Sequence, residues 1–148
     1  MKKLFFNNYY SCFAFFYLVA LLNGLFFYWL SIKYNFTSDN NLSKFGKTTQ
    51  LFIMFLFAPI IETLLFQTLP VEIVKSFYPK SKFLTIFICG CVFGIMHYYH
   101  LIYFFMAFIG GLILGTFYLF TEKKGKSAII YTSIFHSLYN LFGYLFVN

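Results

Sequence analysis

The chain has 148 residues, of which 61% are hydrophobic, 26% are aromatic and only 10% are charged. A soluble domain of this length cannot bury so much apolar surface, so the composition excludes a soluble globular protein and indicates an integral membrane protein. Eleven lysines oppose four acidic residues, which gives a formal charge of +7. The lysines lie between the apolar runs, which favours roles in membrane topology and in contacts with anionic lipids over a nucleic-acid surface.

The hydrophobic pattern predicts an all-α fold, a polytopic transmembrane bundle that forms a single domain over residues 1–148. Its spans are expected at about 9–32, 51–74, 83–99, 101–120 and 127–146. Runs of about 20 residues match a hydrocarbon core about 30 Å thick. The first run is too long for the apolar part of a signal peptide, so we expect it to be retained. Residues 33–50 are polar and form the one substantial loop.

The distribution of lysines predicts the orientation of these spans. With the N-terminus in the cytoplasm, eight lysines fall on the cytoplasmic side and three on the other, as the positive-inside rule favours. The cytoplasmic set is Lys2, Lys3, Lys75, Lys80, Lys82, Lys123, Lys124 and Lys126, and the external set is Lys33, Lys44 and Lys47. The loop at 33–50 is then external.

Four polar side chains stand out because they lie inside predicted spans. Glu62 is the single carboxylate within the apolar run from Leu51 to Leu69, and an ionised acid is kept in a bilayer only where something pairs with it. His97 lies in the third span, and His136 and Asn140 share one face of the last. Unless each group is satisfied locally, three spans bring them to one membrane-buried site.

Proline and glycine are expected to shape the helices around this site. Pro59 precedes Glu62 by three residues, so it should kink the second span and free carbonyls beside the carboxylate. Gly90 and Gly94 lie along one side of the third span together with His97, so a closely packed neighbour would receive the imidazole. The fourth span carries the run Gly110-Gly111-x-x-x-Gly115, which predicts another tight packing surface.

In order and spacing, Glu62-Thr63-x-x-x-Gln67, Phe93-x-x-x-His97 and His136-x-x-x-Asn140 resemble the motifs of the CPBP family of intramembrane proteases, also called the CAAX-protease and bacteriocin-processing (Abi) family. The resemblance covers a core of about 51–147 and implies a helical bundle with a polar intramembrane cavity. The family's first motif is usually Glu-Glu-x-x-x-Arg, and here Thr63 and Gln67 replace an acid and a base together. The resemblance implies catalytic roles for Glu62, His97, His136 and Asn140, with Thr63, Gln67 and Phe93 as supporting residues.

Two mechanisms fit these residues. In the first, Glu62 is the general base, His97 holds and polarises the water, and His136 and Asn140 donate hydrogen bonds to the carbonyl oxygen. In the second, Glu62, His97 and His136 bind a divalent metal such as Zn²⁺ as one carboxylate and two histidines with an open position for water. The sequence does not choose between them, so no cofactor is assigned. Ser133 and Ser137 are interpreted as helix-packing hydroxyls rather than nucleophiles.

The main alternative is an inactive family member that acts as a membrane immunity or scaffolding protein, which the changed first motif favours. A small transporter would also use buried acids and histidines, but the chain lacks the repeated halves of many transporters. We expect the bilayer and a peptide or membrane-protein substrate as partners, and no nucleic acid. The small size favours a multi-pass protein of the bacterial plasma membrane, and the oligomeric state is not indicated.

Overall fold

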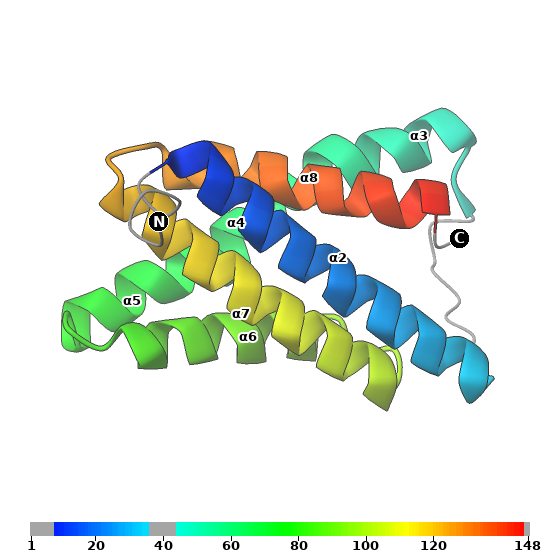
Figure 1. The fold of residues 1–148 in the computed structure, drawn as a ribbon, viewed down its shortest axis with the longest axis horizontal. Coiled ribbons are helices and arrows are strands. Elements are labelled where there is room, and N and C mark those ends of the chain that lie inside the picture. The colour runs from blue at the N-terminus through cyan, green and yellow to red at the C-terminus, as the bar shows by residue number, and fades with distance from the viewer. Residues whose placement is uncertain (1–7, 36–43, 147–148) are drawn as a thin grey trace.

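The computed structural model describes residues 8–35 and 44–146, and this part of the chain is helical without any strand (Figure 1). Part of the predicted external loop, residues 36–43, lies outside the described residues. The helical elements are α2 (Tyr9–Lys33), α3 (Lys47–Phe52), η2 (Ile53–Phe57), α4 (Ala58–Thr63), η3 (Leu64–Thr68), α5 (Leu69–Phe77), α6 (Lys82–Met96), α7 (Leu101–Lys123) and α8 (Ala128–Phe146). Elements α3 to α5 follow one another without a break.

The five predicted helical segments are confirmed, with shifts at their ends. Three of them are long and apolar enough to cross a membrane, namely Tyr9–Lys33, Lys47–Phe77 and Leu101–Lys123, while α6 is apolar but shorter. The second segment begins at Lys47, so the polar loop is shorter than predicted. The third segment was predicted to reach residue 99 but ends at Met96, because the backbone of His97 leaves the helical conformation (φ −109°, ψ 26°).

The second segment is interrupted by two π-helical turns, each of which ends two residues before a proline. In the first turn the N–H of Ala58 bonds the carbonyl of Ile53, one residue further back than in an α-helix. The carbonyl of Met54 then meets Pro59, which has no N–H to donate. The sequence predicted a proline kink here, and the structure resolves it as a widened turn that leaves the Met54 carbonyl without a helical donor.

Helices α6 and α7 pack at backbone distance, as the glycine runs predicted. A Cβ built on Gly111 would lie 2.8 Å from the carbonyl oxygen of Cys89 and 3.0 Å from the Cα of Gly90, so only glycine fits without a backbone shift. One built on Gly115 would lie 2.9 Å from the Cβ of Cys89. Gly110 differs, because nothing lies within 4 Å of its added Cβ.

Helix α2 lies across α7 and α8 (Figure 1). Near its start, the Tyr9 hydroxyl is hydrogen-bonded to the Thr121 side chain at 3.2 Å. Further along, the Tyr17 hydroxyl donates to the Leu138 carbonyl at 2.9 Å. These bonds hold α2 against α7 and α8.

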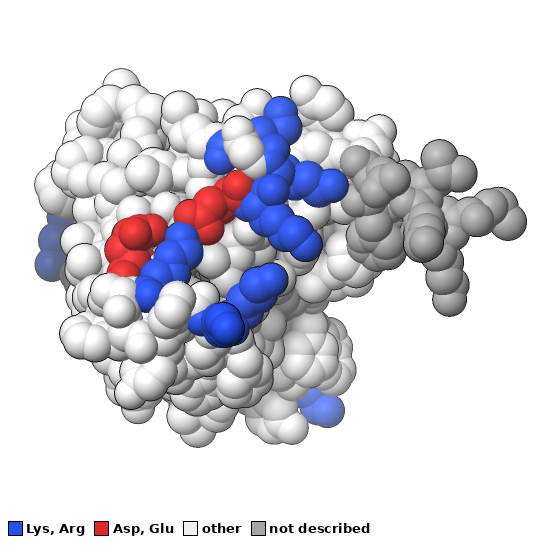
Figure 2. All heavy atoms as spheres, turned by 90° about the vertical axis from the view of Figure 1, so that its left-hand side faces the viewer, with Lys and Arg blue, Asp and Glu red and all other residues white. Residues whose placement is uncertain are grey.

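The two ends of the bundle differ in charge. One end, called here the lysine-rich end, comprises the start of α2, the α5–α6 turn and the α7–α8 turn. Figure 2 looks onto it and shows lysines gathered around acidic side chains. There Lys75 forms ion pairs with Glu72 on its own helix and with Glu122 of α7, which joins α5 to α7. The opposite end comprises the end of α2, the start of α3, the α6–α7 turn and the end of α8.

Candidate intramembrane active site

Glu62, His97 and His136 come together although they belong to three different segments. The Oε2 atom of Glu62 lies 3.5 Å from Nε2 of His97 and 3.6 Å from Nε2 of His136. The carboxylate is on α4, between the two π-helical turns, and its side chain is about one fifth exposed. A partly buried carboxylate flanked by two imidazoles is the kind of pairing that an acid inside a membrane requires.

Phe93 fixes the position of His97. The α6 helix ends just before this histidine, and its ring stacks on the Phe93 ring with centroids 4.3 Å apart and planes at 14°. Nδ1 of His97 lies 2.8 Å from the Phe93 carbonyl, which can only accept, so Nδ1 carries the proton and donates. In the neutral ring Nε2 is then an acceptor facing the carboxylate. The sequence predicted His97 inside the third span, beside Gly90 and Gly94, whereas the structure places it one residue beyond the end of α6.

His136 approaches Glu62 from α8 and is almost fully buried, at 4% exposure. The centroid of its ring lies 5.5 Å from the centroid of the Phe93 ring, so the same phenylalanine packs against both imidazoles. Nδ1 of His136 has no hydrogen-bond partner among the described residues. Nε2 is thus the ring nitrogen that faces the carboxylate, 3.6 Å from Oε2 of Glu62.

Asn140 lies one turn beyond His136 and serves the helix that carries Glu62. Its Nδ2 donates to the Met54 carbonyl at 3.0 Å, the carbonyl that the π-helical turn and Pro59 leave without a helical donor. An unsatisfied carbonyl inside a membrane costs several kcal/mol, so this bond stabilises the widened turn. Asn140 also lines the cavity described below, with a second N–H still available.

Thr63 and Gln67, the two departures from the usual first motif, are both fully buried. The Thr63 hydroxyl and both polar atoms of the Gln67 amide lack a hydrogen-bond partner within the described part of the chain. The structure thus places them inside the bundle beside the Glu62 turn without a bond to the carboxylate. Their supporting role stays a prediction.

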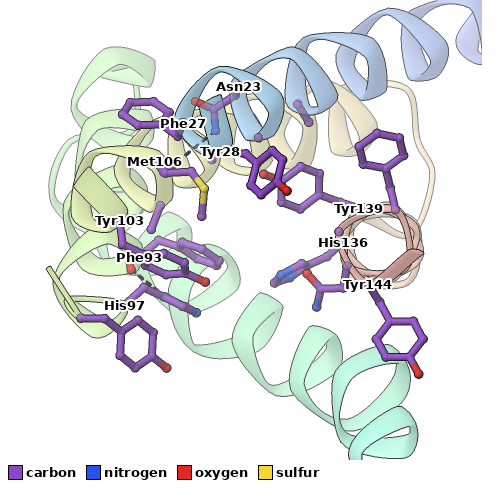
Figure 3. Close-up of a pocket in the computed structure, with 18 of the residues that line it drawn as sticks. Asn23, Phe27, Tyr28, Phe93, His97, Tyr103, Met106, His136, Tyr139 and Tyr144 are labelled. Atoms are coloured by element: carbon purple, nitrogen blue, oxygen red, sulfur yellow. Dashed lines mark hydrogen bonds between the residues drawn. The ribbon is translucent and has the colours of Figure 1, made fainter. Parts of the chain in front are cut away.

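A cavity of about 710 Å³ contains the site (Figure 3). That size is within the range of about 300–1,000 Å³ that is usual for ligand sites. Its wall includes side chains from α2 and α7 that the sequence analysis did not select, among them Asn23, Phe27, Tyr28, Tyr103 and Met106. Asn23 donates to the Met106 carbonyl at 3.0 Å. A lone amide in an apolar span was the signal that could have pointed to this wall.

The site meets one requirement of a metal centre and lacks others. Oε2 of Glu62 lies 3.5 and 3.6 Å from the Nε2 atoms of His97 and His136, which is the spacing of neighbouring ligands on one tetrahedral ion. Among residues 8–35 and 44–146, however, no three His, Cys, Asp or Glu side chains form a complete ligand set, and Nδ1 of His136 lacks the hydrogen-bond partner that a ligating histidine almost always has. The metal version of the mechanism stays a prediction.

The fold and site define an all-helical integral membrane protein with a carboxylate and two imidazoles gathered in a cavity between its helices. A family model described as type II CAAX prenyl endopeptidase Rce1-like matches residues 44–142, which is about two thirds of the chain. The chain therefore belongs to this family of intramembrane CAAX-type endopeptidases, in agreement with the resemblance found in the motifs. Comparisons with curated proteins and with solved structures returned no match. The matched region begins just before α3 and does not include α2.

Proposed function

We propose that this protein is an intramembrane endopeptidase that hydrolyses a peptide bond in a peptide or membrane-associated substrate with a water activated by Glu62. The observation that carries the proposal is the carboxylate of Glu62 within 3.6 Å of two imidazole nitrogens, inside a cavity large enough for a peptide segment. The family assignment supports peptide hydrolysis as the class of reaction.

The hydrogen-bonding groups of the site support a water beside Glu62 and His97. With Nδ1 of His97 donating to the Phe93 carbonyl, Nε2 faces Glu62 as an acceptor, and the ionised carboxylate is also an acceptor. Two acceptors do not bond each other, but a water on the cavity side of the pair can donate one hydrogen to each. Because the two atoms are only 3.5 Å apart, this water lies off the line that joins them. The water oxygen is then free to attack a carbonyl carbon held in the cavity.

The reaction balances with Glu62 as the proton carrier. As the water oxygen bonds the carbonyl carbon, the carboxylate takes one proton. It returns that proton to the amide nitrogen as the C–N bond breaks, so the carboxylate is restored. Nε2 of His136 and the second N–H of Asn140 are the donors available for the oxyanion. Removing one such donor costs about 2.7–4 kcal/mol in other enzymes.

The test is a comparison of peptides released in cells that express the wild type, Glu62→Gln or Glu72→Gln. Glu62→Gln removes the base while keeping size and hydrogen bonding, so the wild-type cleavage products should disappear. Glu72 forms its ion pair at the lysine-rich end and is the matched control, so Glu72→Gln should retain them. A Glu62→Gln protein that yields the full set of products would refute the proposal.

A second function stays open because the first motif is changed. Thr63 and Gln67 are buried without partners where relatives usually carry an acid and a base, which favours a family member that binds a peptide without cutting it, as an immunity or scaffolding protein. In that case Glu62→Gln would keep the full cellular effect of the wild type. The peptides released in cells that express either protein would then be the same.

A further inference from the structure

The cavity occupies only one half of the bundle. Its lining residues begin at Ala20 on α2 and at Phe135 on α8, and they end at Leu114 on α7. These are the halves of the three helices that lie away from the lysine-rich end. The cavity therefore extends from Glu62, near the middle of the bundle, towards one end and not towards the other.

At that end the cavity reaches residues outside the helical core. Asn35 follows the last turn of α2, and Tyr99 lies in the turn between α6 and α7. Both are exposed. Tyr144, close to the end of α8, completes this rim. The cavity thus reaches exposed residues at the end opposite to the lysine-rich end, and this part of it is called here the mouth.

The lysines are divided unequally between the two ends. Of the nine lysines that the structure describes, the lysine-rich end carries six, which are Lys75, Lys80, Lys82, Lys123, Lys124 and Lys126. The end with the mouth carries the other three, which are Lys33, Lys44 and Lys47. Orientation in a membrane follows the count of basic residues in short flanking loops, and acidic residues contribute little. The lysine-rich end is therefore the cytoplasmic one.

We propose that the catalytic cavity opens away from the cytoplasm and takes an extracytoplasmic substrate, namely an exported peptide or the outer segment of a membrane protein. The assignment of a substrate rests on the proposed function, whereas the side on which the cavity opens does not depend on it. The wall around the mouth is largely aromatic, with Phe27, Tyr28, Tyr139 and Tyr144, so it suits an extended segment with apolar side chains.

Thiol labelling tests the side on which the cavity opens. Cells that express Tyr99→Cys, at the mouth, or Lys124→Cys, at the lysine-rich end, are treated with a membrane-impermeant maleimide before and after permeabilisation. Tyr99→Cys should react in intact cells, and Lys124→Cys only after permeabilisation. The wild type is the background control, because Cys12 and Cys89 are buried and Cys91 lies within α6.

The reverse pattern overturns the proposal, and so does labelling of both variants or of neither in intact cells. If either variant fails to accumulate, Tyr144→Cys and Lys80→Cys probe the same two ends. The labelling requires no catalysis, so it decides the side of the mouth even if the protein cuts nothing.

The substrate is tested separately with the peptides that depend on Glu62. Their cleavage sites should map to segments outside the cytoplasm, and sites within cytoplasmic segments would overturn the substrate assignment while leaving the protease proposal intact. If no peptide depends on Glu62, the proposed function fails and the substrate assignment fails with it, whereas the side of the mouth is still decided by labelling.

Discussion

Phe93 organises the site although it carries no chemistry of its own. Its carbonyl accepts from Nδ1 of His97, its ring stacks on the His97 ring, and the same ring lies against His136. The Phe93 carbonyl thus makes Nδ1 of His97 the donor, and the Phe93 ring packs against both imidazoles. Phe93 was chosen from the sequence only as a supporting residue, and the contacts give that role a physical content.

Gln67 is a residue whose substitution has an unusual expected result. Its amide is buried without a partner among the described residues, and replacing such a group by an apolar one of similar shape is close to neutral or stabilising. Gln67→Met should therefore keep or raise the melting temperature in detergent. Gln67→Arg buries an unpaired charge and should destabilise by about 3–5 kcal/mol.

The double variant Thr63→Glu with Gln67→Arg is the control for this prediction. It restores the charged pair that the family usually carries, so it should recover much of the stability that Gln67→Arg loses. If Gln67→Met lowers the melting temperature as much as Gln67→Arg does, the amide has a hydrogen bond that the protein contacts do not show.

At the scale of elements, two prolines and two π-helical turns determine the shape of the helix that carries Glu62. Pro59 and Pro70 each follow such a turn, and Glu62 lies between them. The widened first turn exposes the Met54 carbonyl, and α8 supplies the Asn140 amide to it. The bond ties the helix of the carboxylate to the helix of His136, so the two groups keep their separation.

The α6–α7 contact allows a prediction with a matched neighbour as its control. Gly111→Ala would place a Cβ within 3.0 Å of the α6 backbone, so the two helices must separate. We expect a loss of stability of about 1–3 kcal/mol and a loss of activity, since α6 carries Phe93 and with it His97.

The Cβ that Gly110→Ala adds has no atom within 4 Å, and alanine raises the helix propensity by about 1 kcal/mol. This variant should therefore unfold at the wild-type temperature or above. Thermal unfolding of the two purified variants in the same detergent distinguishes them. Equal loss of stability in both variants would contradict the expectation that Gly111 is required for the close packing of α6 on α7.

At the scale of the whole molecule, the cavity is built from more than the family-matched region. Residues 44–142 contain the carboxylate and both histidines, while α2 adds a wall with Asn23, Phe27 and Tyr28. The attachment of α2 to α7 and α8 by aromatic packing and by the Asn23 and Tyr17 bonds keeps this wall in place. Side chains of α2 are thus in position to contact whatever enters the cavity.

The purified protein provides a test of the two mechanisms. If the proposed mechanism without a metal holds, a preparation made with chelator and shown by elemental analysis to be metal-free should cleave its substrate at the wild-type rate. Activity that is lost with chelator and restored by Zn²⁺, and not by Mg²⁺, would contradict this expectation and return the mechanism to a metal.

Sequence alone determined the membrane class, the five helices and the choice of Glu62, His97 and His136, because each of these follows from local chemistry. Long apolar runs have few alternatives to a membrane, and an ionisable group inside such a run needs a partner. The motif order also sufficed for the family, since spacing along a helix is preserved in the sequence.

Only the tertiary structure decided how the groups meet. The end of α6 at Met96 and the contact of Phe93 with His97 are local features that the sequence pattern did not show. The bond from Asn140 to the Met54 carbonyl joins segments far apart in the chain. The wall from α2 and the end at which the cavity opens have the same origin. Helical periodicity tells which face a residue shares with its neighbours, but packing decides which other helix that face meets.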